Sequence, residues 1–219
     1  MNRTVTKRAY DSAAKEARHQ AILDAASGLF ATTEQMPSVS QIAEAAGLAK
    51  GTVYLYFRTK EEIFAFLLQD GWRHVLEGAG QALTAEPSPV LAIASFVDAY
   101  SEGACSNGNL LRLDALSKGL LEENMTPEAL DAFKTSLFRQ MQACGALIEE
   151  KLDLSQGRGD QLLIRSYALT RGLWQTLGVS NIQECRSGEG PYEFQMELRQ
   201  ALAEYWQGAL RGGREVAAR

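Results

Sequence analysis

Apolar residues recur along the 219-residue chain at helical spacing, and no segment shows the strict apolar–polar alternation that is typical of a β-strand. Ahead of Ala31, the positions Ile22, Ala26 and Phe30 fall on one face of an amphipathic helix. The basic residues 1–11 lack this periodicity, and we expect a mobile arm there. The pattern as a whole predicts an all-α fold.

Two short helices joined by a tight turn are predicted within residues 38–60. Ser38, followed three residues later by Gln41, is the capping-box pattern of a helix N-terminus. Gly47 then supplies the positive φ that a sharp turn needs. The inward-facing residues of the pair are Ile42, Ala46, Leu48, Val53 and Phe57. Small residues inside and a glycine in the turn are what helix-turn-helix packing requires.

Six further helices follow this pair. Their expected spans are 59–78, 90–104, 110–122, 126–152, 162–178 and 192–210. Pro127 directly after Thr126 is a strong helix-start signal, because proline fits the first helical position behind a capping residue. A polar loop is expected at 181–191. We therefore expect two domains, a head at residues 1–60 and a larger helical domain at residues 61–219.

Charge is distributed unevenly between these two parts. The chain carries a formal net charge of −5. The first sixty residues hold eight Lys and Arg against five Asp and Glu, whereas the remainder holds fourteen against twenty-two. An acidic whole argues against a non-specific nucleic-acid coat, and a basic head favours a local footprint on phosphate.

Several classes of protein are disfavoured. No apolar run is long enough for a transmembrane helix, and the N-terminus lacks the apolar segment of a secretory signal. Cys105, Cys144 and Cys185 show no pairing pattern, so we expect reduced thiols in a cytoplasmic protein. His19 and His74 lie far apart without partners at ligand spacing, which argues against a metal site. No catalytic set or cofactor motif favours an enzyme.

The second helix of the pair carries the candidate base-reading residues. In a helix-turn-helix, the first residues of this helix lie nearest the bases of the major groove. Here Lys50 can donate to guanine O6 or N7, Gly51 allows close approach, and Thr52 offers a hydroxyl and a methyl group. Leu55 falls on the outward face, where it can contact a thymine methyl.

Five polar residues are candidates for phosphate contacts. We expect one of Tyr54 and Tyr56 to contact DNA and the other mainly to pack. Lys60 stands at the N-terminus of the following helix, where its charge and the helix dipole both favour a phosphate, although a solvated lysine is the alternative. Ser38 and Ser40 are placed similarly, and Ser38 is equally suited to act only as a helix cap.

The segment 42–64 resembles the signature of the TetR family of transcriptional regulators. The positions that carry the likeness include Gly47, Lys50, Gly51, Thr52, Tyr54, Phe57 and Lys60. The resemblance implies nine helices, a homodimer, and a C-terminal domain that binds a small molecule and thereby releases DNA. Two positions depart from the family pattern, because Ala49 stands where many relatives carry serine, and Leu55 where they carry a polar or aromatic residue.

Aromatic and other large side chains on the C-terminal helices are candidates for an effector pocket. They are Phe96, Tyr100, Phe133, Leu137, Met141 and Trp174. For any one of them, packing in the core is the stronger interpretation. The last two helices carry wide apolar faces, including Leu198 and Trp206, which two chains could bury as a four-helix bundle.

The sequence therefore predicts a dimeric, ligand-responsive DNA-binding regulator, a repressor that a small molecule releases from a palindromic operator. Its expected partners are double-stranded DNA, a small-molecule effector and a second copy of the chain, with no membrane and no cofactor. The main alternative is an all-α small-molecule binding protein whose head is not used on DNA. An enzyme is the third and least favoured class.

Overall fold

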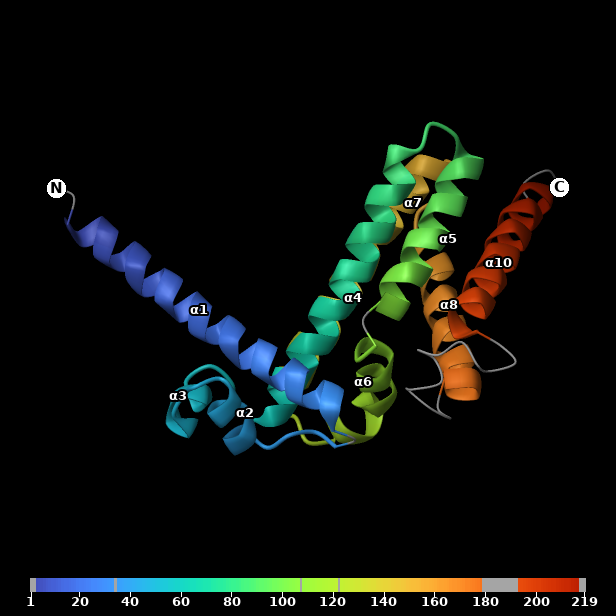
Figure 1. Cartoon of the computed structure of the whole chain (residues 1–219). Helices are drawn as coiled ribbons and strands as arrows, with labels where there is room; N and C mark the ends of the chain where they lie inside the picture. Colours follow the sequence, from blue (N-terminus) through green and yellow to red (C-terminus); the bar gives the residue numbers. More distant parts are fainter. Residues whose placement is uncertain (1–2, 34, 107, 122, 179–192, 217–219) are drawn as a thin grey trace. The chain divides into compact units, whose positions relative to one another are not determined.

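The computed structural model describes residues 3–33, 35–106, 108–121, 123–178 and 193–216. Within these ranges the chain forms nine α-helices, two π-helical turns and no strand (Figure 1). The α-helices are α1 (Arg3–Thr32), α2 (Val39–Ala45), α3 (Lys50–Tyr54), α4 (Lys60–Ala85), α5 (Pro89–Ser106), α6 (Leu110–Leu116), α7 (Pro127–Leu152), α8 (Arg158–Leu173) and α10 (Phe194–Val216). The π-helical turns are Ser117–Leu121 and Trp174–Gly178. The predicted all-α class is confirmed.

The chain forms two compact units. We call the first, made of Met1–Leu67 and Leu116–Leu130, the head. The second, made of Leu68–Ala115 and Asp131–Arg219, is called the body. The functional division after residue 60 stays a prediction. Among the described helices, none combines the length and the apolar character that crossing a membrane requires.

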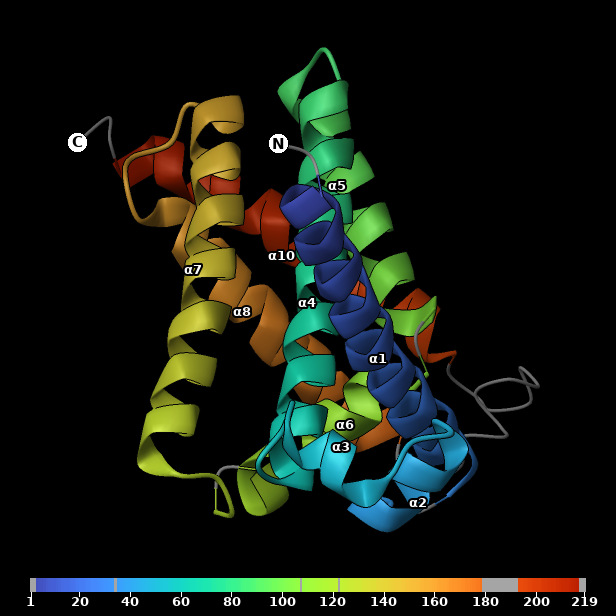
Figure 2. The same cartoon turned by 90° about the vertical axis from the view of Figure 1, so that its left-hand side faces the viewer.

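The core of the head is built by α1, α2 and α3 together with the first turns of α4. α1 packs on α2, and α2 packs on α3 (Figure 2). The buried side chains include Ile22, Ala26, Phe30, Ile42, Val53, Phe57, Ile63 and Phe64. The rings of Phe30 and Phe64 lie 5.4 Å apart. Burial of each large apolar side chain contributes about 1.5–3 kcal/mol, so this small core is enough to fix the positions of the short helices.

The N-terminal residues differ from the expectation of a mobile arm, because α1 already begins at Arg3. Residues 3–21 contain neither glycine nor proline and are rich in Ala, Arg and Lys, which favour helix. Adding residues to an existing helix costs much less than starting one, so the chain extends α1 without an apolar stripe. A search for periodicity therefore missed this part of the helix.

Helix boundaries elsewhere mostly follow the predicted signals. α7 begins at Pro127, and Ala129 N–H donates to Thr126 Oγ1 at 3.3 Å, as the start signal predicted. α8 begins at Arg158, four residues earlier than expected from its apolar pattern, behind Gly157 in the left-handed region with φ 82°. The loop predicted at 181–191 lies outside the described residues.

The core of the body centres on α10, which packs along α5 and α8 (Figures 1 and 2). Trp206 is fully buried, with its ring 4.7 Å from that of Phe96. Its indole N–H donates to Ser166 Oγ at 2.9 Å, so the one polar atom of this side chain is satisfied inside the core. Phe96 in turn stacks on Tyr100 at 6.0 Å. An aromatic column thus joins α5 to α10, and the hydrogen bond to Ser166 ties it to α8.

Four apolar residues of α10 were expected to be buried between two chains, and for these four the interpretation is wrong, while the pairing of two chains stays a prediction. Phe194, Leu198, Leu202 and Trp206 are between 0% and 6% exposed within the single chain. Their packing partners are α5 and α8 of the same protomer. Apolar periodicity predicts that a helix face is buried, but it does not identify the helix or the chain that covers this face. A dimer therefore needs other residues.

Candidate nucleic-acid interface

The turn between α2 and α3 has the geometry that the sequence predicts. Ser38 is the N-cap of α2: its Oγ accepts from Gln41 N–H at 3.3 Å, and Gln41 Oε1 accepts from Ser38 N–H at 2.9 Å. Gly47 has φ 66°, which favours glycine, and Leu48 N–H donates to Ala43 O at 2.9 Å. The capping box and the glycine turn are both confirmed, and they fix the direction in which α3 leaves α2.

Four of the candidate DNA-binding residues share the exposed face of α3. Lys50 and Gly51 are exposed at its start, and Tyr54 and Leu55 are 47% and 81% exposed at its end. Lys50 Nζ lies 6.0 Å from the centre of the Tyr54 ring, so the cation and the aromatic side chain share one side of the helix. A Cβ atom added at Gly51 would meet nothing within 4 Å. No contact within the chain therefore requires a glycine at this position, and the absence of a side chain leaves the surface of α3 accessible to a partner.

Thr52 and Tyr56 are half-buried, whereas Tyr54 and Leu55 between them are exposed. Tyr56 faces the ring of His19 at 6.2 Å, whereas Tyr54 has its ring largely in solvent. Tyr54 is thus better placed to meet a phosphate, and Tyr56 is better placed to pack. Ala49, the N-cap of α3, makes no side-chain hydrogen bond, as its replacement of serine predicts.

The remaining candidates lie at the starts of α2 and α4. Ser40 is exposed in the first turn of α2, whereas the hydroxyl of Ser38 is engaged with Gln41. Lys60 is half-buried, and its Nζ lies 4.0 Å from a carboxylate oxygen of Glu61. The capping role of Ser38 is therefore present without DNA.

Sequence reasoning missed the part that His19 plays in the head. Its ring stacks on Phe57 at 5.1 Å and meets Phe66 edge-on at 5.0 Å. These contacts tie α1 to the turn after α3 and to α4. Because Phe57 lies beyond the end of α3, this aromatic cluster holds the turn that carries Tyr56. The histidine was considered only as a metal ligand, and its aromatic neighbours could not be deduced from spacing.

The candidate pocket residues of the body are largely core. Phe96, Tyr100 and Phe133 are 1%, 1% and 7% exposed, whereas Leu137, Met141 and Trp174 are half-buried. Tyr100 packs against Trp72 at 6.2 Å, and Trp174 packs against Phe194 at 5.3 Å. These contacts place the aromatic rings of α5 and of the turn after α8 within the packed body. Their role in binding an effector stays a prediction.

A buried carboxylate lies next to this aromatic region. Asp114 of α6 is 3% exposed; it pairs with Arg171 at 2.9 Å and accepts from Tyr167 O–H at 2.8 Å and Trp72 N–H at 3.1 Å. Burial raises the pKa of Asp114, while Arg171, Tyr167 and Trp72 counteract this rise. The network ties α4, α6 and α8 of the body together. The sequence placed Asp114 and Arg171 on helices but gave no sign of their pairing.

Two family models match the chain. Residues 22–66 match the model described as bacterial regulatory proteins, tetR family. Residues 69–213 match the model described as tetracyclin repressor-like, C-terminal domain, which is more than half of the chain. A curated relative, the fatty acid metabolism regulator protein of Bacillus subtilis (strain 168), is 39% identical over 64 residues, which are 29% of this chain. The match spans about a third, 33%, of that relative's length.

Solved structures of similar fold cover most of the chain. A putative transcriptional regulator from Pseudomonas aeruginosa PAO1 has a TM-score of 0.58 at 18% identity, covering 92% of both chains. The TetR family regulator PfmR from Thermus thermophilus has a TM-score of 0.55 at 18% identity, covering 84% of this chain and 96% of its own. FadR from Bacillus subtilis, solved in complex with stearoyl-CoA, has a TM-score of 0.54 at 18% identity, covering 84% and 95%.

At this level of identity, the solved structures support the fold alone. The family models extend the match to the sequence, on both the head and the body. The turn geometry between α2 and α3 agrees with them, because a capped helix, a glycine turn and an exposed second helix are the parts of a helix-turn-helix. The chain therefore belongs to the TetR family of bacterial transcriptional regulators, which are not enzymes.

Proposed function

We propose that the chain is a ligand-responsive repressor that binds a palindromic operator through α3 and the turn after it. The single observation that supports this most strongly is the 81% exposure of Leu55, next to exposed Lys50 and Tyr54. A leucine this exposed gains nothing from the head itself. Contact with an apolar group of a binding partner would remove it from water, and the thymine methyl group in the major groove of DNA is such a group.

The remaining residues of this surface divide by role. Lys50 donates to guanine or to a phosphate, Gly51 lets the backbone approach, and Thr52 reaches a base edge. Tyr54 and Lys60 contact phosphates through a hydroxyl and an ammonium group. Ser38 and Ser40 assist at the start of α2, although the capping box already occupies the hydroxyl of Ser38. Tyr56 mainly supports the turn from inside.

We also propose that two copies pair through the exposed face of α8. Ile164 is 48% exposed, and Ala168 and Gly172, one and two turns further on, are exposed as well. Small residues beside a large apolar one let two helices approach closely, which suits a two-fold interface. A two-fold dimer presents two copies of α3, so it reads two half-sites about 34–36 Å, or a multiple of that, apart.

The body supplies the response to a small molecule. Phe96, Tyr100 and Trp174, with Phe133, Leu137 and Met141 of α7, are the residues proposed to contact the effector. One structural neighbour, FadR from Bacillus subtilis, was solved with stearoyl-CoA, which favours an apolar or amphipathic effector here too. An effector that binds the DNA-incompetent state more tightly shifts the population away from DNA by its difference in affinity for the two states.

A selection experiment tests this function. The purified protein is mixed with fragmented DNA from its own genome, and the retained fragments are sequenced. We expect enrichment of a short near-palindrome, and loss of that enrichment in the Lys50→Ala, Tyr54→Ala double variant at unchanged thermal stability. Small molecules that release the wild-type protein from the enriched fragment would then identify the effector class.

The alternative, a small-molecule binding protein whose head is not used on DNA, predicts a different result. In that case no sequence is enriched, and the double variant keeps whatever ligand binding the wild type has. The exposed cation and aromatic ring favour the regulator, because they and Leu55 lie on or directly after the second helix of a helix-turn-helix, the element that enters the major groove.

A further inference from the structure

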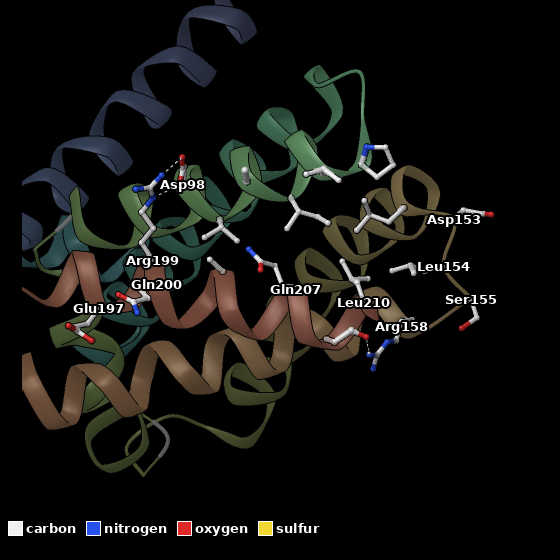
Figure 3. Close-up of a pocket in the computed structure, with 18 of the residues that line it drawn as sticks. Asp98, Asp153, Leu154, Ser155, Arg158, Glu197, Arg199, Gln200, Gln207 and Leu210 are labelled. Carbon is white, nitrogen blue, oxygen red and sulfur yellow. Dashed lines mark hydrogen bonds and ion pairs between the residues drawn. The ribbon is translucent and has the colours of Figure 1, made fainter. Parts of the chain in front are cut away.

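A groove runs along the outer surface of the body between α5, α10 and the turn that joins α7 to α8 (Figure 3). Its volume is about 1180 Å³, slightly above the range of roughly 300–1,000 Å³ that is usual for small-molecule sites. Apolar side chains line its central part. They are Ile93 and Val97 of α5, Leu152 and Leu154 beside the turn, and Met196 and Leu210 of α10. Met196 is 65% exposed, so this apolar surface is open to solvent.

The groove is distinct from the sites already described. Phe96 and Tyr100 are in the same helix, α5, but do not line the groove, whereas Ile93 and Val97 do, Val97 as a floor residue that is only 2% exposed. The exposed α8 face at Ile164 does not line it either. A ligand in the groove would therefore compete neither with the aromatic interior nor with the proposed dimer interface.

At one end of the groove an ion pair joins α5 to α10. Arg199 of α10 binds both carboxylate oxygens of Asp98 of α5, its Nη2 lying 3.0 Å from Oδ2 (Figure 3). This pair links the two walls of the groove and carries no net charge. Gln200 adds an uncharged polar group at the same end.

The other end holds a cation whose partners are neutral. Arg158 Nη1 donates to Gln161 Oε1 at 3.0 Å. Its Nη2 donates to the carbonyl oxygen of Ala209 at 3.2 Å (Figure 3). Among the described side chains, no carboxylate lies within ion-pair distance of Arg158. The guanidinium is half-buried and held in place by α10, so its positive charge is oriented but not neutralised.

Acidic residues near the groove weaken this positive charge only slightly. Asp153 is exposed to solvent, where screening reduces its effect. Glu197 lies at the opposite end, beside the Asp98–Arg199 pair (Figure 3). The carboxylate of Glu149 accepts from Gly159 N–H at 2.9 Å and does not line the groove.

From the apolar floor and the Arg158 guanidinium, which has no carboxylate partner among the described side chains, we propose that the groove binds a single-chain amphiphile with an anionic head, of the long-chain carboxylate class. The aliphatic chain lies against Ile93, Val97 and Met196, and the head meets Arg158. A charge-assisted hydrogen bond to an oriented guanidinium is the stronger kind, and it gives the site a preference for an anion over a neutral head. The proposal does not depend on DNA binding, because it concerns the body alone.

Calorimetric titration of the full-length protein tests the proposal with three probes that share one chain: dodecanoate, dodecanol and dodecyltrimethylammonium, each below its micelle concentration. We expect saturable binding of dodecanoate, one per chain, about tenfold tighter than dodecanol. Preference for the ammonium probe, or equal binding of all three, would overturn the assignment of an anionic head.

Variants separate the groove from other sites. Ala203→Trp fills the groove from α10 and is expected to abolish dodecanoate binding, whereas Ala132→Trp, on an exposed part of α7, leaves it unchanged. Arg158→Gln is expected to remove the preference for dodecanoate over dodecanol, and Arg158→Lys to restore most of it; Arg165→Gln is the matched control on α8. Undiminished binding by a folded Ala203→Trp variant, judged by its circular dichroism melt, would refute the location.

Discussion

Leu55 has the highest exposed fraction, 81%, of the large hydrophobic residues that the structure describes. We predict that Leu55→Ala weakens binding to the selected operator about fivefold, since it removes roughly 1 kcal/mol of apolar contact. The free energy of unfolding should change by less than about 0.5 kcal/mol. Fluorescence anisotropy and denaturant unfolding measure the two quantities. Leu91→Ala, an exposed leucine of α5, is the control, and equal affinities for both variants would remove Leu55 from the interface.

Asp114 is the buried residue whose ionisation should be visible in stability. Its folded-state pKa is raised above the ordinary value of 3.8, chiefly by burial, so the folded state takes up a proton before the unfolded state does. The free energy of unfolding of the wild type therefore increases as the pH falls through the folded-state pKa of Asp114 towards 3.8. This increase is lost again as the pH rises through the folded-state pKa. Asp114→Asn lacks this component.

We accordingly predict that the wild type gains stability relative to Asp114→Asn on acidification, because only the wild type takes up a proton at this position. Denaturant unfolding over a pH series checks this, with exposed Asp131→Asn as control. A wild type that loses stability relative to the variant on acidification would contradict the raised pKa.

At the scale of elements, the crossing of α7 and α8 depends on two glycines. A Cβ atom added at Gly159 would lie 2.7 Å from the backbone carbonyl carbon of Gly145 and 2.8 Å from its Cα. We predict that Gly159→Ala destabilises the body by about 3 kcal/mol, the cost of overpacking against backbone that cannot move aside. Gly78→Ala in α4, where an added Cβ atom would meet nothing within 4 Å, should instead stabilise by about 0.5–1 kcal/mol. Thermal unfolding distinguishes the two, and equal melting temperatures would mean that the crossing is loose.

Elements with local signals were the ones that the sequence predicted well. The capping box at Ser38, the turn at Gly47 and the start of α7 at Thr126 each depend on residues only a few positions apart in the sequence. The exposure of the outward-facing residues of α3 could be predicted from the same local geometry. The Asp114–Arg171 pair joins positions 57 residues apart, and its existence depends on how α6 and α8 pack. The inward face of α10 was likewise recognised as apolar, but its partners were not.

At the scale of the whole molecule, pairing through α8 should be sensitive to charge. We predict that Ala168→Arg converts a dimer into a monomer at micromolar concentration, because two like charges would meet on the two-fold axis. Sedimentation equilibrium measures the mass, and Ala132→Arg on α7 is the control. If wild type itself sediments as a monomer, the proposed interface is wrong.

The central claim is that α3 and the turn after it hold DNA, and the salt dependence of operator affinity tests it most directly. The dissociation constant of the enriched fragment is measured over a series of salt concentrations for wild type and for Lys50→Ala. Affinity should fall linearly on a double logarithmic plot, with a slope of about −0.9 for each phosphate contact, and Lys50→Ala should bind more weakly at every salt concentration. Binding that does not change with salt, or that Lys50→Ala leaves intact, would contradict the account.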